Sequence, residues 1–166
     1  MDATSFTRED APIRVRPYVP ADEAFVFGLA PRLLVGIAPW RNPERMLVAV
    51  QRWLEDSMKQ HGTQTALFIA EDERGERLGV ASVSHEHHFT GEEEAYIGEL
   101  ATNDAAEGRG VGRILVAACE QWAREHGYAF LTLHTGAANE RARGFYRHLG
   151  FQEEDVKLVK PLSDAS

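Results

Sequence analysis

Three closely spaced glycines, at positions 108, 110 and 112, constrain this chain more than any other feature. The run Ala95–Thr102 before them is apolar and alternating, as in a strand, and apolar residues from Ile114 to Trp122 after them recur at helical spacing. Glycines let the backbone turn its N–H groups toward one point, and the start of a helix adds about half a positive charge. A strand, a glycine-rich loop and a helix in this order predict an anion site, most often for phosphate.

The composition narrows the classes of partner. A chain of 166 residues fits one domain, and its 43% hydrophobic content is enough for a sizeable core. A net charge of −8 without any basic run argues against nucleic acid and anionic membranes as partners. The polar start, Met1–Asp10, is unlike a signal peptide, and no window approaches the ~18 apolar residues of a membrane helix. We therefore expect a soluble, cytoplasmic protein. The single cysteine, Cys119, excludes an internal disulfide and is expected to be a buried structural thiol.

Hydrophobic periodicity predicts the elements in chain order. Strands are expected over 13–19, 65–71, 77–85, 95–102, 130–134 and 156–159. Helices are expected from Pro20 past Leu29 with a stop or bend at Pro31, and over 43–62, 111–126 and 139–149. Asp22 and Asn42 are candidate helix caps, and Glu73–Glu76 has the composition of a hairpin turn. These elements predict one α+β domain over residues 13–160, with tails at 1–12 and 161–166.

Two stretches together resemble the signatures of the GNAT superfamily of N-acyltransferases. The first is Leu100–Asp104 leading into Glu107–Gly112, which resembles the acyl-CoA-binding signature Arg/Gln-x-x-Gly-x-Gly/Ala. The second comprises Asn139, Ala142, Phe145, Tyr146, Gly150 and Phe151. The resemblance covers about residues 13 to 160. It implies a mixed α/β sheet in which an antiparallel meander is followed by a split parallel strand pair, with about four helices.

The resemblance also implies a binding site for acetyl-CoA, with no metal. The residues that it assigns to the cofactor are Leu100, Ala101, Thr102, Glu107, Gly108, Arg109, Gly110, Val111, Gly112, Arg113, Asn139 and Tyr146. Glu107 departs from the Arg or Gln of the family pattern, and a carboxylate near a pyrophosphate weakens binding unless it points to solvent. Arg109 and Arg113 are the expected compensating charges. Asn139 also fits a plain helix N-cap.

Transfer of an acyl group to an amine needs a base, a stabilised carbonyl oxygen and a proton for the departing thiolate. By resemblance, Glu99 is the candidate base, the Thr102 N–H the oxyanion donor on a bulged, splayed strand, and Tyr146 the acid near the sulfur. The alternative for Glu99 is a solvated or arginine-paired side chain. For the Thr102 N–H it is an ordinary hydrogen bond within the sheet, and for Tyr146 it is a core aromatic residue beside Phe145.

Three further features have simpler interpretations. His85 and His87 would share a strand face, but two histidines without a completing ligand are too few for a closed metal site, so we expect none. Glu92–Glu94 is expected to be a solvated turn. Trp40 is expected to be a core anchor rather than a substrate contact.

The sequence therefore favours an N-acetyltransferase that moves an acetyl group from acetyl-CoA to a primary amine of a small molecule or protein, by direct attack in a ternary complex. A homodimer is compatible with this reading. The first alternative is a non-catalytic acyl-CoA-binding sensor or scaffold. The second is a dinucleotide-binding oxidoreductase, which is disfavoured because the strand after the glycine loop ends His134-Thr135-Gly136, without the ribose-binding carboxylate.

Overall fold

The computed structural model describes residues 12–163 and contains a five-stranded sheet of order β1-β2-β3-β4-β5. The antiparallel strands are β1 (Ile13–Pro17), β2 (Ala66–Asp72), β3 (Arg77–His87) and β4 (Glu93–Thr102), and β5 (Leu131–Leu133) is parallel to β4. The helices are α1 (Glu23–Gly28), α2 (Pro43–Gln60), α3 (Val111–Glu125) and α4 (Glu140–His148). Three short 3₁₀ turns, η1 (Pro20–Asp22), η2 (Ala30–Leu34) and η3 (Asp104–Ala106), join them.

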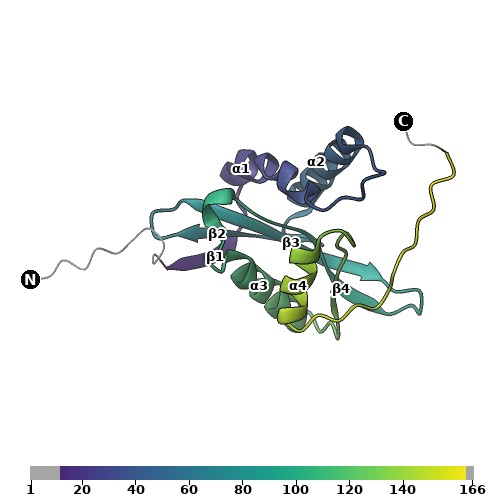
Figure 1. Ribbon diagram of the computed structural model, residues 1–166. Coiled ribbons are helices and arrows are strands. Elements are labelled where there is room, and N and C mark those ends of the chain that lie inside the picture. Colours follow the sequence, from purple (N-terminus) through teal and green to yellow (C-terminus); the bar gives the residue numbers. More distant parts are fainter. Residues whose placement is uncertain (1–11, 164–166) are drawn as a thin grey trace, which may run out of the picture.

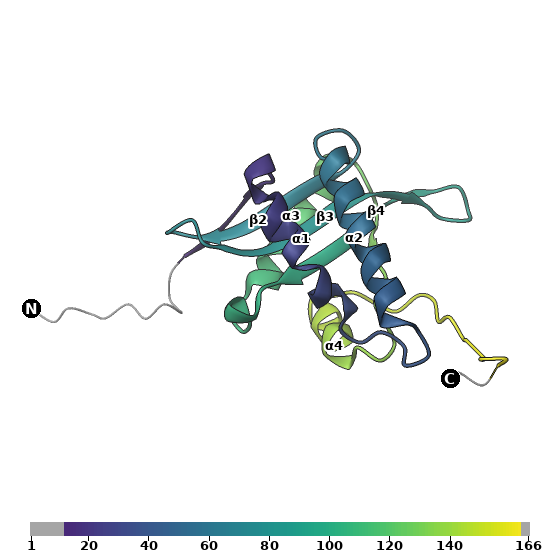
Figure 2. The ribbon, with the colours of Figure 1, turned by 90° about the horizontal axis from the view of Figure 1, so that it is seen from above.

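The sheet separates two hydrophobic cores. Helices α1 and α2 cover one face, and α3 and α4 lie on the other (Figure 1; Figure 2). Side chains of β2 pack in both cores, because successive side chains of a strand point to opposite faces of the sheet. Leu67 and Ile69 pack with α1 and α2, whereas Phe68 and Ala70 pack with α3. The expected antiparallel meander followed by a parallel pair is therefore confirmed.

Local sequence signals explain most element boundaries. Asn42 caps α2, because its Oδ1 accepts a hydrogen bond from the Arg45 N–H at 3.0 Å. The hairpin between β2 and β3 is closed by Asp72, whose Oδ1 accepts from two turn amides, and Gly75 adopts a φ of 78° there. Helix α3 ends before Gly127, as expected. The first predicted helix is instead divided into η1, α1 and η2, with Pro31 inside the second 3₁₀ turn.

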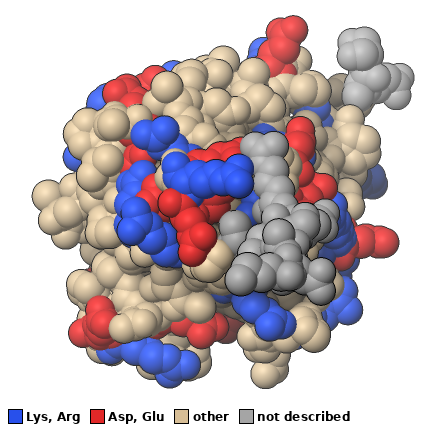
Figure 3. All heavy atoms as spheres, turned by 90° about the vertical axis from the view of Figure 1, so that its left-hand side faces the viewer, with Lys and Arg blue, Asp and Glu red and all other residues tan. Residues whose placement is uncertain are grey.

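Asp22 serves an ion cluster rather than a helix cap. Its fully buried carboxylate accepts hydrogen bonds from the Val19 N–H and from the guanidinium groups of Arg16 and Arg77. Arg16 also reaches the buried carboxylate of Glu71. The bonds from Arg16, the largest of several causes, hold the pKa of Asp22 well below its usual value. Basic and acidic side chains interleave over this end of the molecule (Figure 3).

The predicted last strand, 156–159, is wrong. Residues 151–162 contain no regular structure, and the segment runs outward from α4 in both ribbon views (Figure 1; Figure 2). Val156 is 74% exposed and Leu158 is 90% exposed. A strand needs a neighbour for its N–H and C=O groups, and no described strand lies beside this segment. The expected tail at 1–12 lies almost wholly outside the described residues.

Two more sequence interpretations are corrected, and one is confirmed. Trp40 is 44% exposed and is therefore not a core anchor. Glu94 is buried, because it belongs to β4 and not to a solvated turn. Cys119 is buried as expected, and burial raises the pKa of its thiol to about 12. Within the described residues, no helix is both long and apolar enough to cross a membrane.

Candidate active site

The glycine loop leads into an uncapped helix. Gly108 and Gly110 both adopt left-handed backbone conformations, with φ of 77° and 76°, which residues with a β-carbon rarely adopt. Gly110 is the N-cap of α3 and has no side chain to offer, and the first helical bond runs from Ile114 N–H to the Gly110 carbonyl. The amides of Val111–Arg113 therefore have no acceptor within the helix. This is the geometry of an anion site.

The negative charge of Glu107 is balanced by arginine side chains. Its Oε1 lies 2.5 Å from Arg32 on η2 and 3.6 Å from Arg141 on α4, and these partners, Arg32 first, lower its pKa. Arg32 also bonds Asp104 at 2.5 Å. The arginines that contact Glu107 are thus Arg32 and Arg141, which are distant from it in sequence, and the expected contribution of Arg109 and Arg113 stays a prediction.

Two residues of the loop, Gly112 and Arg109, have surroundings that bear on ligand binding. A β-carbon on Gly112 would stand 3.2 Å from the Phe145 ring, so this glycine allows α3 and α4 to approach closely. Arg109 has two side-chain nitrogens, Nε and Nη2, that are shielded from solvent and have no hydrogen-bond partner in the described protein. A buried guanidinium group is costly without acceptors. Both the loop amides and this side chain fit a phosphate-bearing cofactor.

Strands β4 and β5 diverge next to the loop. They pair only over Ala95–Ile97, although β4 continues to Thr102. The pairing of β4 with β3 also shifts by one residue between Ala81 and Val83, which indicates a bulge. The splay and the bulge expected from the resemblance are both present.

The divergence leaves backbone groups of β4 without a strand partner. Asn103 N–H donates to Leu78 on β3, so the groups of Thr102 face the other edge, and the Thr102 carbonyl accepts from Arg32 there. Strand alternation puts the Leu100 N–H on this same edge. Thr102 N–H therefore faces the side on which β5 has moved away. The side chain of Ala101 packs with α1 and α2.

Glu99 lies at the bulge and is only 5% exposed. Its carboxylate accepts hydrogen bonds from the hydroxyl groups of Ser82 on β3 and Ser57 on α2, the latter at 3.1 and 3.2 Å, and no arginine among residues 12–163 pairs with it. Ser82 in turn accepts from the Glu99 N–H at 3.0 Å. Burial is the largest influence and raises the pKa of Glu99. A carboxylate with a raised pKa is better matched to proton transfer near neutral pH.

Tyr146 approaches from α4. Its ring makes edge contacts with Phe145 and Phe151, with centroids 5.1 and 5.6 Å away. Burial raises its pKa to about 12, so the phenol is protonated at physiological pH. Asn139 is an N-cap: its Oδ1 accepts from Ala142 N–H at 3.1 Å, and its Nδ2 donates to Val35 O at 3.2 Å. The polar atoms of Asn139 are thus used within the protein.

Sequence reasoning missed Ser57, Ser82 and Arg32. Ser57 is a half-buried residue of α2 and is 42 residues from Glu99, and nothing in the local pattern connects the two. Arg32 is likewise more than 70 residues from its acidic partners. The register shift at the bulge between β3 and β4 decides which serine side chains face Glu99.

An open strand edge beside a buried carboxylate, with an uncapped helix start nearby, is compatible with an enzyme that transfers acyl groups. The model of the acetyltransferase (GNAT) family matches residues 32–151. The chain belongs to this family, and it is an acyltransferase enzyme.

Curated relatives carry acetyltransferase names. The chain is 38% identical over 71 residues to the uncharacterized N-acetyltransferase YycN of Bacillus subtilis (strain 168), a match that covers 43% of this chain and 46% of that protein. The match therefore spans less than half the length of that relative. The chain is also 28% identical over 145 residues to the aminoglycoside N(6')-acetyltransferase type 1 of Stenotrophomonas maltophilia. This match covers 85% of the chain and 87% of that protein.

Solved structures share the fold. A GCN5-related N-acetyltransferase from Ralstonia eutropha JMP134 superposes with a TM-score of 0.71 at 18% identity, covering 91% of this chain and 99% of that one. The structure of AAC(6')-Iy in complex with the bisubstrate analog CoA-S-monomethyl-acetylneamine gives a TM-score of 0.66 at 20% identity, covering 92% of this chain and all of that one.

Proposed function

We propose that this acetyltransferase moves the acetyl group of acetyl-CoA to a primary amine of a small, cationic molecule, which attacks the thioester directly in a ternary complex. The observation that carries the proposal is the position of Glu99. A buried carboxylate with a raised pKa sits on β4 at the bulge, just before the edge left open by β5. A structural glutamate would gain nothing from burial without an arginine partner.

The residues around the glycine loop fit the diphosphate of the cofactor. The amides of Val111, Gly112 and Arg113 would bind phosphate oxygens, and the unpartnered guanidinium nitrogens of Arg109 would add charge-assisted bonds. The edge groups of Leu100 would bind the pantetheine arm by adding it as a strand-like neighbour to β4, which leaves the Thr102 N–H for the thioester oxygen. When bound, the cofactor supplies an activated thioester carbonyl.

The chain's own groups then handle charge and protons. Glu99 takes a proton from the bound ammonium group, directly or through one water, and the free amine then attacks the thioester carbonyl. The Thr102 N–H, which faces the open edge, donates to the carbonyl oxygen as negative charge develops on it. Tyr146 donates a hydrogen bond to the departing thiolate. A phenol with a pKa near 12 is a weak acid toward a thiolate, so hydrogen bonding contributes more than complete proton transfer.

The acceptor class is inferred from charge and from one relative. A net charge of −8 favours a cationic acceptor over an acidic one. The relative with the longer match acts, by its name, on an aminoglycoside. The alternative is a module that binds acyl-CoA without turnover, and the buried Glu99 carboxylate with its raised pKa argues against it.

Thiol release tests the proposal. Acetyl-CoA is incubated with the protein and, in separate reactions, an aminoglycoside, a linear polyamine, a neutral amino alcohol and a lysine-containing peptide, and free CoA is followed with a thiol reagent. We expect amine-dependent release with a cationic small molecule, and mass spectrometry should find the acetylated product. Calorimetric binding of acetyl-CoA without release for any amine would establish the binding module instead.

We also infer that the protein forms a homodimer through the segment 152–160. The segment starts at the Arg143–Glu153 ion pair, at 2.7 Å, and then leaves the body with Val156 and Leu158 exposed. Its first half is acidic over 153–155, and its second half carries Lys157 and Lys160. Antiparallel pairing with the same segment of a second copy would bring each acidic half opposite a basic half and would cover both apolar side chains. A second copy therefore fits this segment.

Light scattering coupled to size exclusion tests this interface. The wild-type chain should have the mass of a dimer, and the double variant V156K/L158K should have the mass of a monomer. L162K changes an equally exposed apolar residue beyond the segment and should stay dimeric. A monomeric wild type, or a dimeric V156K/L158K variant, would contradict the inference.

A further inference from the structure

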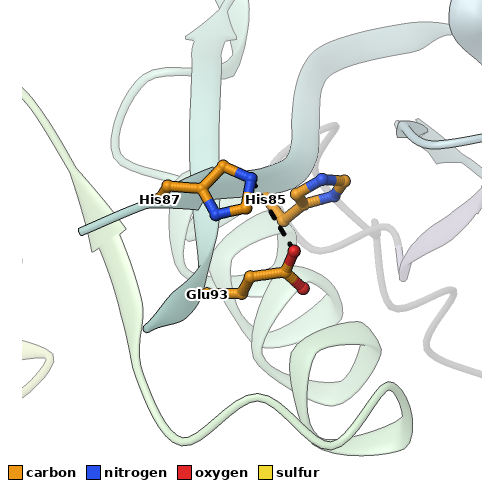
Figure 4. A group of neighbouring side chains, drawn as sticks. All are labelled: His85, His87 and Glu93. Atoms are coloured by element: carbon orange, nitrogen blue, oxygen red, sulfur yellow. Dashed lines mark ion pairs between the residues drawn. The ribbon is translucent and has the colours of Figure 1, made fainter. Parts of the chain in front are cut away.

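The far end of the β3–β4 hairpin brings two histidines and a glutamate together. His85 and His87 lie two residues apart on β3 and therefore share a face. Glu93 is the partner of His87 in the register of β3 and β4. One ligand atom from each of the three side chains lies within 4.8 Å of the other two, and His87 Nε2 is 3.7 Å from Glu93 Oε1. The three side chains lie close together, and His87 and Glu93 form an ion pair (Figure 4).

We propose that His85, His87 and Glu93 bind a zinc ion. Two imidazoles and a carboxylate are ligands that Zn²⁺ accepts, in a tetrahedral site whose fourth position is left to water. Zinc bonds of about 2.0–2.2 Å place neighbouring ligand atoms roughly 3.4 Å apart. The pair His87–Glu93 already has nearly this spacing, and small rotations of the half-buried His85 ring and of the exposed His87 and Glu93 side chains can close the rest.

The surrounding structure holds the ligands in place. The hairpin turn is closed by bonds from His88 N–H to Glu92 O and from Gly91 N–H to His88 O, both at 2.9 Å, which fixes the register. On the other side, the Tyr128 ring stacks on the His85 ring at 6.4 Å and an interplanar angle of 15°. Ligands fixed on two paired strands lose little freedom when they bind an ion.

Sequence spacing alone did not reveal the third ligand. Two histidines were visible, but the identity of the residue opposite His87 depends on the length and type of the turn. Glu92, Glu93 and Glu94 are equivalent in the sequence. In the structure only Glu93 joins the histidines.

Zinc binding by the full chain, purified without a histidine tag, tests the proposal. Competition with a chromophoric chelator gives the dissociation constant, and thermal unfolding gives an independent measure. Zinc at about 100 times its dissociation constant should raise the unfolding midpoint by roughly 5–10 °C, because the ion binds only the folded chain. The variants H85A, H87A and E93Q should each weaken binding at least tenfold and lose this shift.

Two matched variants separate this site from unspecific binding. H88A removes the next histidine, whose Nδ1 lies 2.8 Å from the Thr90 hydroxyl and which is outside the cluster, and E92Q removes a neighbouring carboxylate. Both should bind zinc like the wild type. Absence of wild-type binding, or an equal loss in H88A and H87A, would overturn the proposal. Circular dichroism of each variant establishes that it folds.

Discussion

Replacement of Glu99 by glutamine tests the candidate base most directly. Glutamine has nearly the same shape and can still bond Ser57 and Ser82, so the substitution removes proton acceptance and little else. A primary amine with a pKa near 10.4 is deprotonated in roughly one molecule in 2,500 at pH 7. Without a base, only this fraction can attack. We expect kcat/KM at pH 7 to fall by about 10³, within the 10²–10⁴ range of general base catalysis.

The pH profile distinguishes this cause from a structural one. As pH rises toward the amine pKa, free amine increases about tenfold per unit, so the difference between wild type and E99Q should shrink by about that factor. The matched control is E94Q, which changes another buried carboxylate on β4 outside the open edge and should alter the rate little at any pH. An E99Q profile parallel to that of the wild type would refute the role of Glu99.

The stability of E99Q provides a second check. Burial raises the pKa of Glu99 in the folded chain, so the ionised carboxylate opposes folding. The protonated Glu99 side chain contributes fully to stability below the pKa of the unfolded chain, about 4.3. This contribution is lost as pH rises through the higher pKa of the folded chain. At pH 7, E99Q should therefore unfold at the same temperature as the wild type or above it. A large decrease would mean that the loss of activity reports misfolding.

Three other predictions concern the loop, the phenol and the ion cluster. G110V should abolish acetyl-CoA binding, measured by calorimetry. The control G127V puts the same backbone strain at a φ of 78° beyond the other end of α3 and should keep this binding. Equal affinities of the two variants for acetyl-CoA would contradict the assignment of the loop to phosphate. Y146F should lower kcat about 10- to 100-fold with little change in acetyl-CoA affinity, measured by steady-state kinetics and calorimetry, and unchanged kinetics would make Tyr146 a packing residue. D22N should cost about 3 kcal/mol in urea unfolding at pH 7, because it leaves two arginines without their buried partner. Since the pKa of Asp22 is depressed, its contribution is present above about pH 4 and lost below it, so wild type and D22N should converge in acid; a constant difference would contradict the ion-cluster account.

The sequence was informative where a local rule decides the outcome. The left-handed glycines, the Asn42 and Asn139 caps and the two-residue alternation of β2 each depend on residues within a few positions of one another. It was uninformative where distant segments meet. The Arg32–Glu107 pair and the Ser57–Glu99 bond join elements separated by more than 40 residues, and no spacing rule reaches that far. The segment 156–159 has the alternation of a strand, but alternation does not place a segment beside a sheet edge, and no strand of the described residues pairs with it.

A single irregularity in β4 accounts for both halves of the candidate site. At the bulge, β4 has one residue more than β3, and Gly98 lies where a β-carbon would stand 3.1 Å from the Ser82 hydroxyl. The absence of that β-carbon leaves Ser82 free to bond both the amide and the carboxylate of Glu99. The same extra residue shifts the alternation of β4, so that Leu100 and Thr102 present their amides to the edge that β5 has left. A regular strand would have put Glu99 on the opposite face, toward α3, and the amides of Leu100 and Thr102 toward β3. The proposed base and the proposed oxyanion donor thus both depend on one inserted residue, and a variant that restored regular pairing would lose both together.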